Sequence, residues 1–455
     1  MSASTPTSSH LGSLSLPRTP TSKLGLPSVS SASLSPYSGV GRRHSIYGTE
    51  DRVVIDLGSL YVKCGFSGES KPRHILHVPG DLRCHRNGTT CSESCRPTGE
   101  SSELYTLDLR RGDTTILEEK LIHYLHQIYF KHLLTDPKLR KVILCESPLF
   151  PVQLKQIIAK VLFENLQVPS ISFVPTHLLA LLTTGQTTGL IVDCGNIETT
   201  VLPIFDARPL YHSVQTTPLA GKALTKHLRT LINSYCYVTP LHSPLERLPV
   251  TEEILTPSLL EEIKTRLLFV SPIKPINDSP QVGHDIADFE ERYAHSSLAA
   301  DIEYCIPGTA KEPMKLFVPG WVRERTAELL FEGDEDERSL VWCILDCLLK
   351  LQPDLRGPLA TSILVIGGTS MLPNFQPRLH QEIVRALQDL PKYKTLAGLS
   401  DRLHFLDEES GSIFPSNTRG WIGGSLVGSL KSSGPEITKD KFVGQVPDWS
   451  IMHAA

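Results

Sequence analysis

Apolar runs bounded by polar and glycine residues predict short strands from residue 53 onward. The segments "VVIDL" and "YVKCGF" read as two strands joined by a tight turn at Gly58 and Ser59. The pattern returns in "GLIVDCGNIETTVLPIF", where an apolar run again leads into an aspartate, a glycine turn and a second run. Residues 53–66 and 190–205 are thus two copies of one Asp-Gly hairpin. Such a repeat predicts two similar halves, each an α/β unit of a sheet wrapped by helices.

Apolar residues at helical spacing predict amphipathic helices between and after the hairpins. Leu117, Leu121, Leu125 and Ile128 lie on one helix face. Capping-box patterns open two of the helices, at Thr115-x-x-Glu118 and at Ser258-x-x-Glu261. The predicted helices cover residues 117–134, 151–166, 176–184, 219–232, 258–270, 321–331 and 339–351.

Two further glycine pairs follow the second hairpin. In "SILVIGGTSMLP" an apolar strand runs into Gly367 and Gly368, and in "GWIGGSLVGSL" we expect Gly423 and Gly424 at a helix start. A glycine pair at a strand-to-helix turn lets the backbone approach a ligand closely.

Charge and composition exclude several classes of protein. The formal net charge of −4 gives no support for a nucleic-acid partner. No apolar run is long enough for a membrane span. Residues 1–48 are rich in Ser, Thr and Pro and predict a disordered tail. That tail carries Ser-Pro and Thr-Pro pairs, which are either phosphorylation sites or features of a passive tail.

Cysteine usage indicates a reducing compartment. Most of the ten Cys residues sit inside apolar runs and are expected to act as small buried side chains. The exception is "CHRNGTTCSESC", with Cys84, His85, Cys91 and Cys95. This spacing fits no common zinc pattern, so a metal site and a polar loop that happens to contain Cys both remain open.

The two hairpins, "IGGTSMLP" and "WIGGS", in this order, resemble the actin family over nearly the whole chain after the tail. The resemblance implies an α/β, two-lobed fold, duplicated and with a nucleotide cleft between the lobes. Its actin-like domain would cover residues 49–455. The first lobe would comprise residues 49–185 and 420–455, and the second residues 186–419.

The resemblance also implies which residues would form the cleft. Asp56 and Asp193 would organise Mg²⁺ through a nucleotide, and the hairpin turns would donate N–H groups to phosphates. The nucleotide-binding residues implied in this way are Asp56, Gly58, Ser59, Lys63, Asp193, Gly195, Lys264, Gly367, Gly368 and Thr369.

Several positions depart from the pattern of the family. Leu60 and Ile197 replace glycines of the two turns, and a side chain there should crowd a phosphate. Lys160 is expected at the position of the glutamine that orients the attacking water. Four more departures from this pattern are Asn196 for Asp, Thr200 for His, Glu261 for a basic residue and Thr265 for Glu.

We therefore expect that ATP hydrolysis is lost and that the chain has no catalytic residues. Whether a nucleotide is bound is left open. One alternative is ATP or ADP with Mg²⁺ as a structural ligand. The other is that the retained polar residues form buried hydrogen bonds and ion pairs that hold the lobes together.

Five segments point to one branch of the family, namely "QIYFKHLL", "RKVILCES", "TTGLIVDCG", "PKYKTLAG" and the tail motif "VPDW". They resemble the actin-related subunit at the pointed end of the dynactin filament. The resemblance implies a non-catalytic protein of the cytoplasm and cytoskeleton. Its partners would be the filament subunits and pointed-end proteins of dynactin and, indirectly, dynein.

Two alternatives remain. One is an ATP-hydrolysing enzyme of the wider actin and chaperone superfamily, and the other is a nuclear chromatin-remodelling actin-related protein. The loops over residues 81–105 and 271–300 would lie near filament contacts and are candidates for ending a filament, or they are ordinary loop variation.

Overall fold

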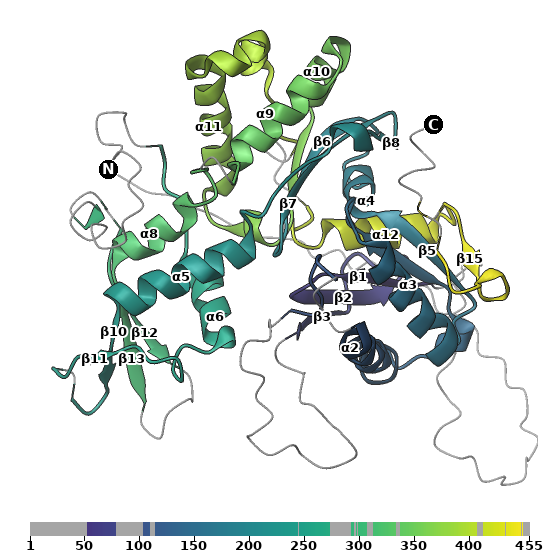
Figure 1. Cartoon of the computed structure of the whole chain (residues 1–455), viewed down its shortest axis with the longest axis horizontal. Coiled ribbons are helices and arrows are strands. Elements are labelled where there is room, and N and C mark those ends of the chain that lie inside the picture. Colours follow the sequence, from purple (N-terminus) through teal and green to yellow (C-terminus); the bar gives the residue numbers. More distant parts are fainter. Residues whose placement is uncertain are drawn as a thin grey trace, which may run out of the picture. The chain divides into compact units, whose positions relative to one another are not determined.

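Three β-sheets organise the computed structural model of this chain (Figure 1). The structure describes residues 52–78, 103–109, 114–243, 245–273, 299–306, 313–333, 337–406, 413–432 and 434–446, with residues 293, 294, 297 and 448. All of them belong to one unit, residues 49–455. The predicted tail, the Cys84–Cys95 cluster and most of the loops over 81–105 and 271–300 lie outside the described residues.

The first sheet contains the first Asp-Gly hairpin. Strands β1 and β2 pair antiparallel, with Asp56 opposite Lys63, and β1 also pairs parallel with β4. Val53, Ile55 and Leu57 enter one apolar cluster while Val54 enters another, as expected for a strand buried on both faces. The strands in spatial order are β15 (Ile437–Thr438), β5 (Ser170–Pro175), β4 (Val142–Glu146), β1 (Val53–Leu57), β2 (Tyr61–Phe66) and β3 (His74–His77).

Helices cover both faces of this sheet. On one face lie α2 and α3, which continue into the short π-helical turns η2 and η4, and on the other face lie α4 and α12. Their bounds are α2 (Thr114–Gln127), η2 (Ile128–His132), η3 (Pro137–Leu139), α3 (Val152–Lys160), η4 (Val161–Asn165), α4 (Thr176–Leu182) and α12 (Arg419–Ser429).

The second sheet repeats this arrangement around the second hairpin. Strands β6 and β7 pair antiparallel, with Asp193 opposite Thr200, and β6 pairs parallel with β14. Helix α4 packs between the two sheets, since Leu179 joins the cluster of the first sheet and Leu181 that of the second. The strands are β14 (Ile363–Ile366), β6 (Gly189–Cys194), β7 (Thr199–Phe205) and β8 (Arg208–Pro209), with the 3₁₀ turn η5 (Tyr211–Ser213) leading to β9 (Gln215–Thr217) on β7.

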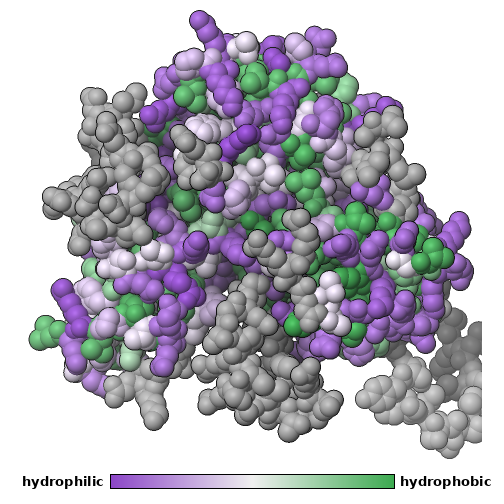
Figure 2. All heavy atoms as spheres, viewed as in Figure 1, coloured by the Kyte–Doolittle hydropathy of each residue, from purple (hydrophilic) through white to green (hydrophobic). Residues whose placement is uncertain are grey.

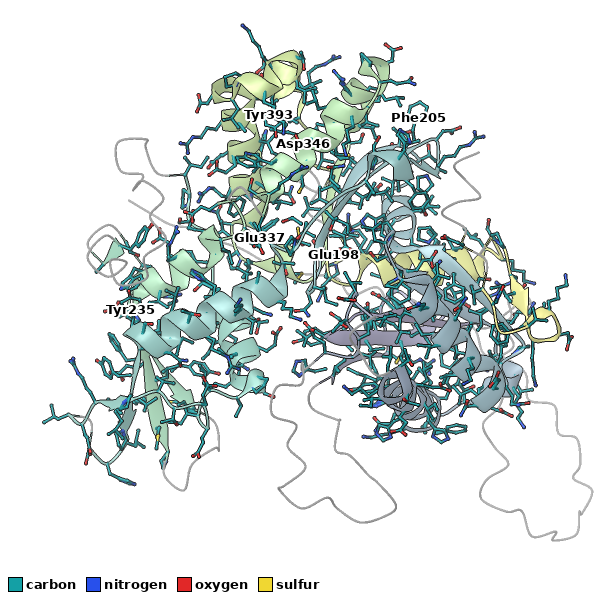
Figure 3. The ribbon with its side chains drawn as sticks, in the orientation of Figure 1. Glu198, Phe205, Tyr235, Glu337, Asp346 and Tyr393 are labelled. Carbon is teal, nitrogen blue, oxygen red and sulfur yellow. The ribbon has the colours of Figure 1, made fainter. Side chains whose placement is uncertain are left out.

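Helices α9 and α10 lie against the second sheet, with α11 and η9 beside them. Asp346 of α9 accepts a hydrogen bond of 2.9 Å from the buried Tyr393 hydroxyl of η9 (Figure 3). It also forms ion pairs with Lys392 (2.6 Å) and Arg338 (3.3 Å). The elements are α9 (Leu340–Lys350), α10 (Pro353–Ala360), η8 (Thr369–Met371), α11 (Phe375–Asp389) and η9 (Pro391–Arg402).

The third sheet is small and entirely antiparallel. Helices α5, α6 and α8 pack with it in the same apolar cluster as the second sheet. In Figure 3, Tyr235 of α5 lies on this side of the molecule, and its ring contacts Trp321 edge-on with centroids 4.8 Å apart. The elements are β11 (Leu248–Pro249), β10 (Tyr237–Pro240), β13 (Met314–Val318), β12 (Ile302–Ile306), α5 (Gly221–Tyr235), α6 (Pro257–Leu267) and α8 (Gly320–Glu328).

The predicted N-cap of α6 is wrong by two residues. Thr256, not Ser258, is the N-cap, and its side chain accepts a hydrogen bond of 3.2 Å from Leu259 N–H. Pro257 explains this shift, because proline without its N–H fits the first helical position. The cap predicted at Thr115 is also wrong, because α2 begins at Thr114 and Thr115 lies inside the helix. Ser339 caps α9, where its hydroxyl accepts a hydrogen bond of 3.4 Å from Trp342 N–H.

The expectation for Gly423 and Gly424 is also wrong. Both lie inside α12 rather than at its start. A Cβ at Gly423 would meet the carbonyl oxygen of Leu179 at 2.0 Å, so glycine is required for the close packing of α12 on α4. Trp421 of the same helix is fully buried and donates a hydrogen bond of 3.0 Å to Val54 C=O. These glycines hold the first sheet and its helices together.

The surface visible in Figure 2 is mostly hydrophilic, with apolar residues scattered between polar ones. This distribution follows from amphipathic elements that turn their apolar faces inward. Within the part of the chain that the structure describes, no helix is both long and apolar enough to cross a lipid bilayer.

The C-terminal segment is folded back onto the first sheet. Strand β15 pairs antiparallel with β5, and the 3₁₀ turn η10 (Lys439–Lys441) follows it. The Phe442 ring lies 4.9 Å from that of Phe163, and Val446 of the "VPDW" motif is buried in the same apolar cluster.

Candidate functional site

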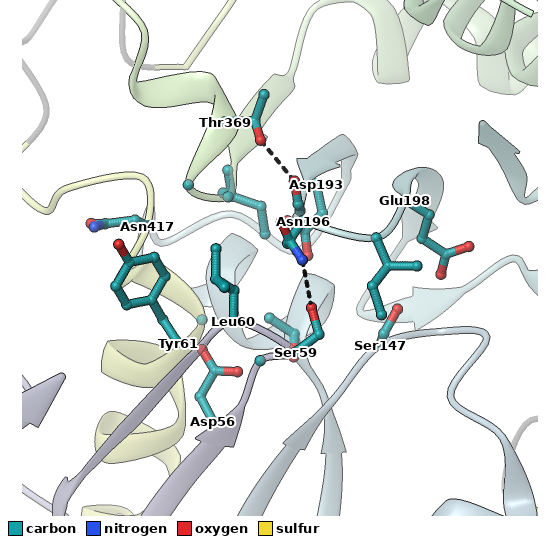
Figure 4. A pocket seen from close by; sticks show the side chains of 18 of the residues that line it. Asp56, Ser59, Leu60, Tyr61, Ser147, Asp193, Asn196, Glu198, Thr369 and Asn417 are labelled. Carbon is teal, nitrogen blue, oxygen red and sulfur yellow. Dashed lines mark hydrogen bonds between the residues drawn. The ribbon is translucent and has the colours of Figure 1, made fainter. Parts of the chain in front are cut away.

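All ten residues predicted for the cleft line one cavity of about 510 Å³. It lies between the turns of the two hairpins, the third glycine turn and helix α6 (Figure 4). The predicted contacts of these residues with a nucleotide and Mg²⁺ stay predictions. The residues themselves are Asp56, Gly58, Ser59, Lys63, Asp193, Gly195, Lys264, Gly367, Gly368 and Thr369.

The third glycine turn is built directly onto the second hairpin. Gly367 has φ +98°, and a Cβ there would lie 2.2 Å from Cys194 C=O and 2.7 Å from Asp193 Oδ1. The Thr369 hydroxyl donates a hydrogen bond of 2.7 Å to Gly195 C=O (Figure 4). This close approach accounts for the glycine and places Asp193 at the floor of the cavity.

Asp56, Lys63 and Asp193 form the charged centre of the cavity. Lys63 Nζ lies 2.7 Å from Asp56 Oδ2. Burial, followed by the nearby Asp56 carboxylate, raises the pKa of Asp193 to about 7. Burial opposes the charge of Lys63, but Asp56 raises the pKa of Lys63 above its usual value. The ammonium group is therefore engaged by the first hairpin's own carboxylate.

A second lysine of the cavity is engaged in the same way. Lys264 and Glu261 of α6 are both buried and lie 2.5 Å apart. Lys264 also donates to the Thr225 hydroxyl at 3.0 Å. Glu261 accepts a hydrogen bond of 3.2 Å from the Tyr61 hydroxyl, which ties α6 to strand β2. The Glu261 carboxylate thus pairs with Lys264 and accepts a hydrogen bond from Tyr61.

A polar bridge joins the two hairpin turns. Asn196 Nδ2 donates to Ser59 Oγ at 3.1 Å (Figure 4) and to Glu103 Oε1 at 3.1 Å. Glu103 Oε2 in turn lies 2.7 Å from Lys222 Nζ. We call Ser59, Glu103, Asn196 and Lys222 the clasp. No motif in the sequence points to Glu103 or Lys222, because Glu103 follows a long polar segment and no local pattern relates it to either hairpin.

Both turns carry the bulky side chains expected from the sequence. Leu60 and Ile197 line the cavity, where glycines would leave room. The rest of the apolar lining includes Leu57, Ile75, Tyr105, Leu107, Phe150, Leu224, Ile366, Met371 and Leu372. Apolar side chains thus form a large part of the walls, beside the charged groups, the glycine turns and several Ser, Thr and Asn side chains.

The placement of Lys160 at a water-orienting position is wrong. Lys160 lies at the end of α3, where its Nζ pairs with Glu118 of α2 at 2.8 Å, and it does not line the cavity. Lys160 lies on the solvent-facing side of α3, which turns its ammonium group away from the cavity. Thr176 is the residue that lines the cavity from the start of α4.

Next to Thr176, a buried histidine fixes Thr200. His177 Nε2 and the Thr200 hydroxyl are 2.8 Å apart, and burial lowers the pKa of His177 to about 3. The imidazole is therefore neutral and ties α4 to the second hairpin. Neither Thr176 nor Thr200 offers the long amide or the imidazole that would orient a water for attack on a phosphate.

Both lysines that could meet a nucleotide's polyphosphate are already paired within the chain. The lining includes four carboxylates, from Asp56, Asp193, Glu198 and Glu261, against the two lysines Lys63 and Lys264, and both lysines are paired with carboxylates of the chain. An anion would have to displace these pairs in a negatively charged cavity. The Mg²⁺ role expected for Asp56 and Asp193 depends on that polyphosphate. No cluster of three or more potential metal ligands occurs among the described residues.

Comparison with known proteins agrees with this geometry. The family model described as "Actin" matches residues 48–442. The chain is 25% identical over 434 residues to "Actin-related protein 10" of Dictyostelium discoideum, covering 88% of this chain and 89% of the relative. It is 26% identical to "Actin-related protein 4" of Arabidopsis thaliana (85% and 95% covered) and 25% identical to "Actin-like protein 7A" of Rattus norvegicus (84% and 78%). Two Asp-Gly hairpins on paired sheets, joined by a third glycine turn, together with a match over most of the residues, show that the chain belongs to the actin family.

Proposed function

We propose that this chain is a non-catalytic actin-related subunit of dynactin. It would lie at the pointed end of the actin-like filament, in the cytoplasm and cytoskeleton, and support dynein-driven movement along microtubules. Its partners would be the terminal filament subunits and the other pointed-end proteins.

The observation that carries the non-catalytic part is the engagement of both cavity lysines by Asp56 and Glu261. Phosphoryl transfer depends on free cationic groups and a positioned water. Here both lysines are paired within the chain. Thr176 and Thr200, which line the cavity, offer neither a long amide nor an imidazole that could orient a water. Losing such groups typically costs orders of magnitude in rate.

Support for the dynactin assignment comes from the segments that resemble that branch. Their side chains serve in packing: Tyr393 of "PKYKTLAG" is buried against Asp346, and Val446 of "VPDW" is buried on the first sheet. The Dictyostelium relative carries the name actin-related protein 10. The three relatives have different names but nearly the same sequence identity to this chain, so identity alone does not choose between them. The five segments are what favours the dynactin branch.

A filament end explains the combination of a kept fold and a lost site. Actin-like filaments grow through repeated complementary surfaces, so an open end invites further addition. A family member that keeps one filament-binding face and changes the other ends the array. Such a role needs the shape of the family and not its hydrolysis.

Affinity purification of the tagged full chain with mass spectrometry tests the proposal. We expect dynactin pointed-end subunits to be recovered. Their absence, or enrichment of chromatin-remodelling subunits together with nuclear localisation by imaging, contradicts the assignment. Co-pelleting adds a second test, because incorporation along whole actin filaments is incompatible with a protein that ends them.

A single-turnover ATPase assay tests the non-catalytic part separately. We expect no turnover that differs between the wild-type protein and Asp56→Ala. Turnover that depends on Asp56 would favour the ATP-hydrolysing alternative.

A further inference from the structure

The clasp joins segments that are far apart in the sequence. Ser59 belongs to the turn of the first hairpin, and Asn196 to that of the second. Glu103 and Lys222 complete the clasp from the segment before α2 and the first turn of α5. Its hydrogen bonds and ion pair run from one hairpin turn to the other without interruption.

Backbone contacts fix each side of the clasp to its own hairpin. Leu104 N–H donates to Ser59 C=O at 2.7 Å, and the Tyr105 hydroxyl donates to Leu57 C=O at 2.9 Å. On the other side, Lys222 N–H donates to Asn196 C=O at 2.7 Å. Glu103 is thereby carried by the first hairpin, whereas Asn196 and Lys222 are carried by the second.

Glu103 is the central group of the clasp. Its side chain is 4% exposed, and each carboxylate oxygen has one partner, Asn196 Nδ2 or Lys222 Nζ. A buried carboxylate is tolerated only when it is paired and hydrogen-bonded. Since both partners lie on the second hairpin's side, the carboxylate is satisfied only while the two turns stay together.

We propose that Glu103 is an internal anion that closes the cleft, so that the two hairpin turns are held together without a phosphate-bearing ligand. The Glu103 carboxylate binds the Lys222 ammonium group and the Asn196 amide, and so holds the second hairpin turn against the first. An anionic group of a ligand between the turns could make the same kind of contact. This inference deepens the proposed non-catalytic function, since a cleft closed in this way needs no nucleotide.

Thermal unfolding of the full chain with and without MgATP tests the role of Glu103. We expect no shift of the wild-type midpoint with MgATP. Glu103→Ala leaves Asn196 and Lys222 without their partner and should lower the midpoint by about 3 °C. MgATP should then raise the midpoint of this variant, because Lys222 and Asn196 lose their carboxylate partner and can take up a phosphate oxygen between the turns.

Glu103→Gln is the second variant, should the alanine variant fail to fold. It keeps the size of the side chain and an oxygen for Asn196 but removes the charge that pairs with Lys222. We expect a smaller loss and the same gain of response to MgATP. Glu303→Gln is the matched control, because its exposed carboxylate also pairs with a lysine, Lys315, at 2.9 Å; it should change neither property.

Two results would overturn the proposal. One is a wild-type protein that MgATP stabilises as much as the Glu103 variants, and the other is variants that remain as unresponsive as the wild type. Chromatography of the small molecules released from denatured wild-type protein adds an independent measurement. Stoichiometric ATP or ADP there also contradicts a cleft that closes on its own carboxylate.

The outcome is separable from that of the proposed function. Recovery of dynactin subunits with a chain that carries bound ATP would support the function and overturn the role of Glu103. The opposite result is a nucleotide-free chain whose Glu103→Ala variant is stabilised by MgATP but which recovers no dynactin subunits. It would support the role of Glu103 and contradict the proposed function.

Discussion

Asp56 and Lys63 face each other across the first hairpin, and their side chains form an ion pair of 2.7 Å at the floor of the cavity. Asp193 of the second hairpin also faces this pair, and its charge adds to the pull on Lys63. The Lys63 ammonium group therefore interacts with two carboxylates, Asp56 from the first half of the fold and Asp193 from the second.

Removing that ammonium should destabilise the protein. Lys63→Met leaves two carboxylates close together without a cation, and we expect the free energy of unfolding to fall by about 2–4 kcal/mol. Urea denaturation measures this loss. Adding Asp56→Asn in the same chain should recover most of it, and a double variant as unstable as Lys63→Met alone would contradict the account.

Asp193 should make the protein less stable as the pH rises from about 4 to about 7. Its folded pKa of about 7 lies above the usual 3.8, so in this range the folded state holds a proton that the unfolded state has lost. We expect Asp193→Asn to be more stable than the wild type by about 1–3 kcal/mol at pH 8 and by less at pH 5. Denaturation at both pH values measures the difference, with the exposed Asp401→Asn as control.

His177 should act in the opposite direction, below neutral pH. Burial lowers its folded pKa to about 3, so below pH 6.5 the unfolded state gains a proton that the folded state does not take up. This group therefore costs about 1.4 kcal/mol of stability per pH unit as the pH falls from 6.5 toward 3. Denaturation at several pH values below 6.5 measures this loss. The free energy of unfolding of His177→Gln should fall less steeply with falling pH than that of the wild type or of the exposed His212→Gln control. Equal slopes would show that His177 does not cause the loss of stability in acid.

The contact between α12 and α4 should tolerate no side chain at Gly423. A Cβ there would lie 2.0 Å from Leu179 C=O, so we expect Gly423→Ala to cost about 2–3 kcal/mol. Gly398→Ala is the matched control, since nothing lies within 4 Å of its added Cβ. Chemical denaturation of both variants should separate them clearly.

Lys160 should have no part in nucleotide chemistry. Because its ammonium pairs with Glu118 outside the cavity, Lys160→Gln should change neither nucleotide binding nor hydrolysis. The Thr176→Gln variant places an amide at the cavity wall and is the informative comparison. An ATPase activity that appears in Lys160→Gln and not in Thr176→Gln would show that the position of Lys160 matters after all.

The sequence predicts the parts of this fold that depend on local pattern. Apolar runs that end in Asp and Gly predicted both hairpins, and helical spacing predicted the helices that cover them, because these signals come from neighbours within a few residues. The ten residues that share the cavity were implied by the resemblance to the actin family and not by local pattern alone.

Contacts between distant segments could not be predicted in this way. Glu103 meets Asn196 only after two hairpins, a loop and a helix are in place. Lys160 was misplaced because the resemblance to the family does not reveal which face of α3 carries its side chain. Gly423 and Gly424 were expected at a turn that approaches a ligand. Close packing between helices also requires glycine, so the sequence alone does not distinguish the two cases.

The packing of Trp421 against Val54 has a consequence for biosynthesis. The first sheet begins at residue 53, yet its indole partner and its edge strand β15 lie more than 360 residues later in the chain. A nascent chain on the ribosome that has emerged with β1 to β5 still lacks the helix covering one face and the strand completing one edge. The first sheet is therefore among the last parts of the fold to be completed, because its covering helix and its edge strand are translated late.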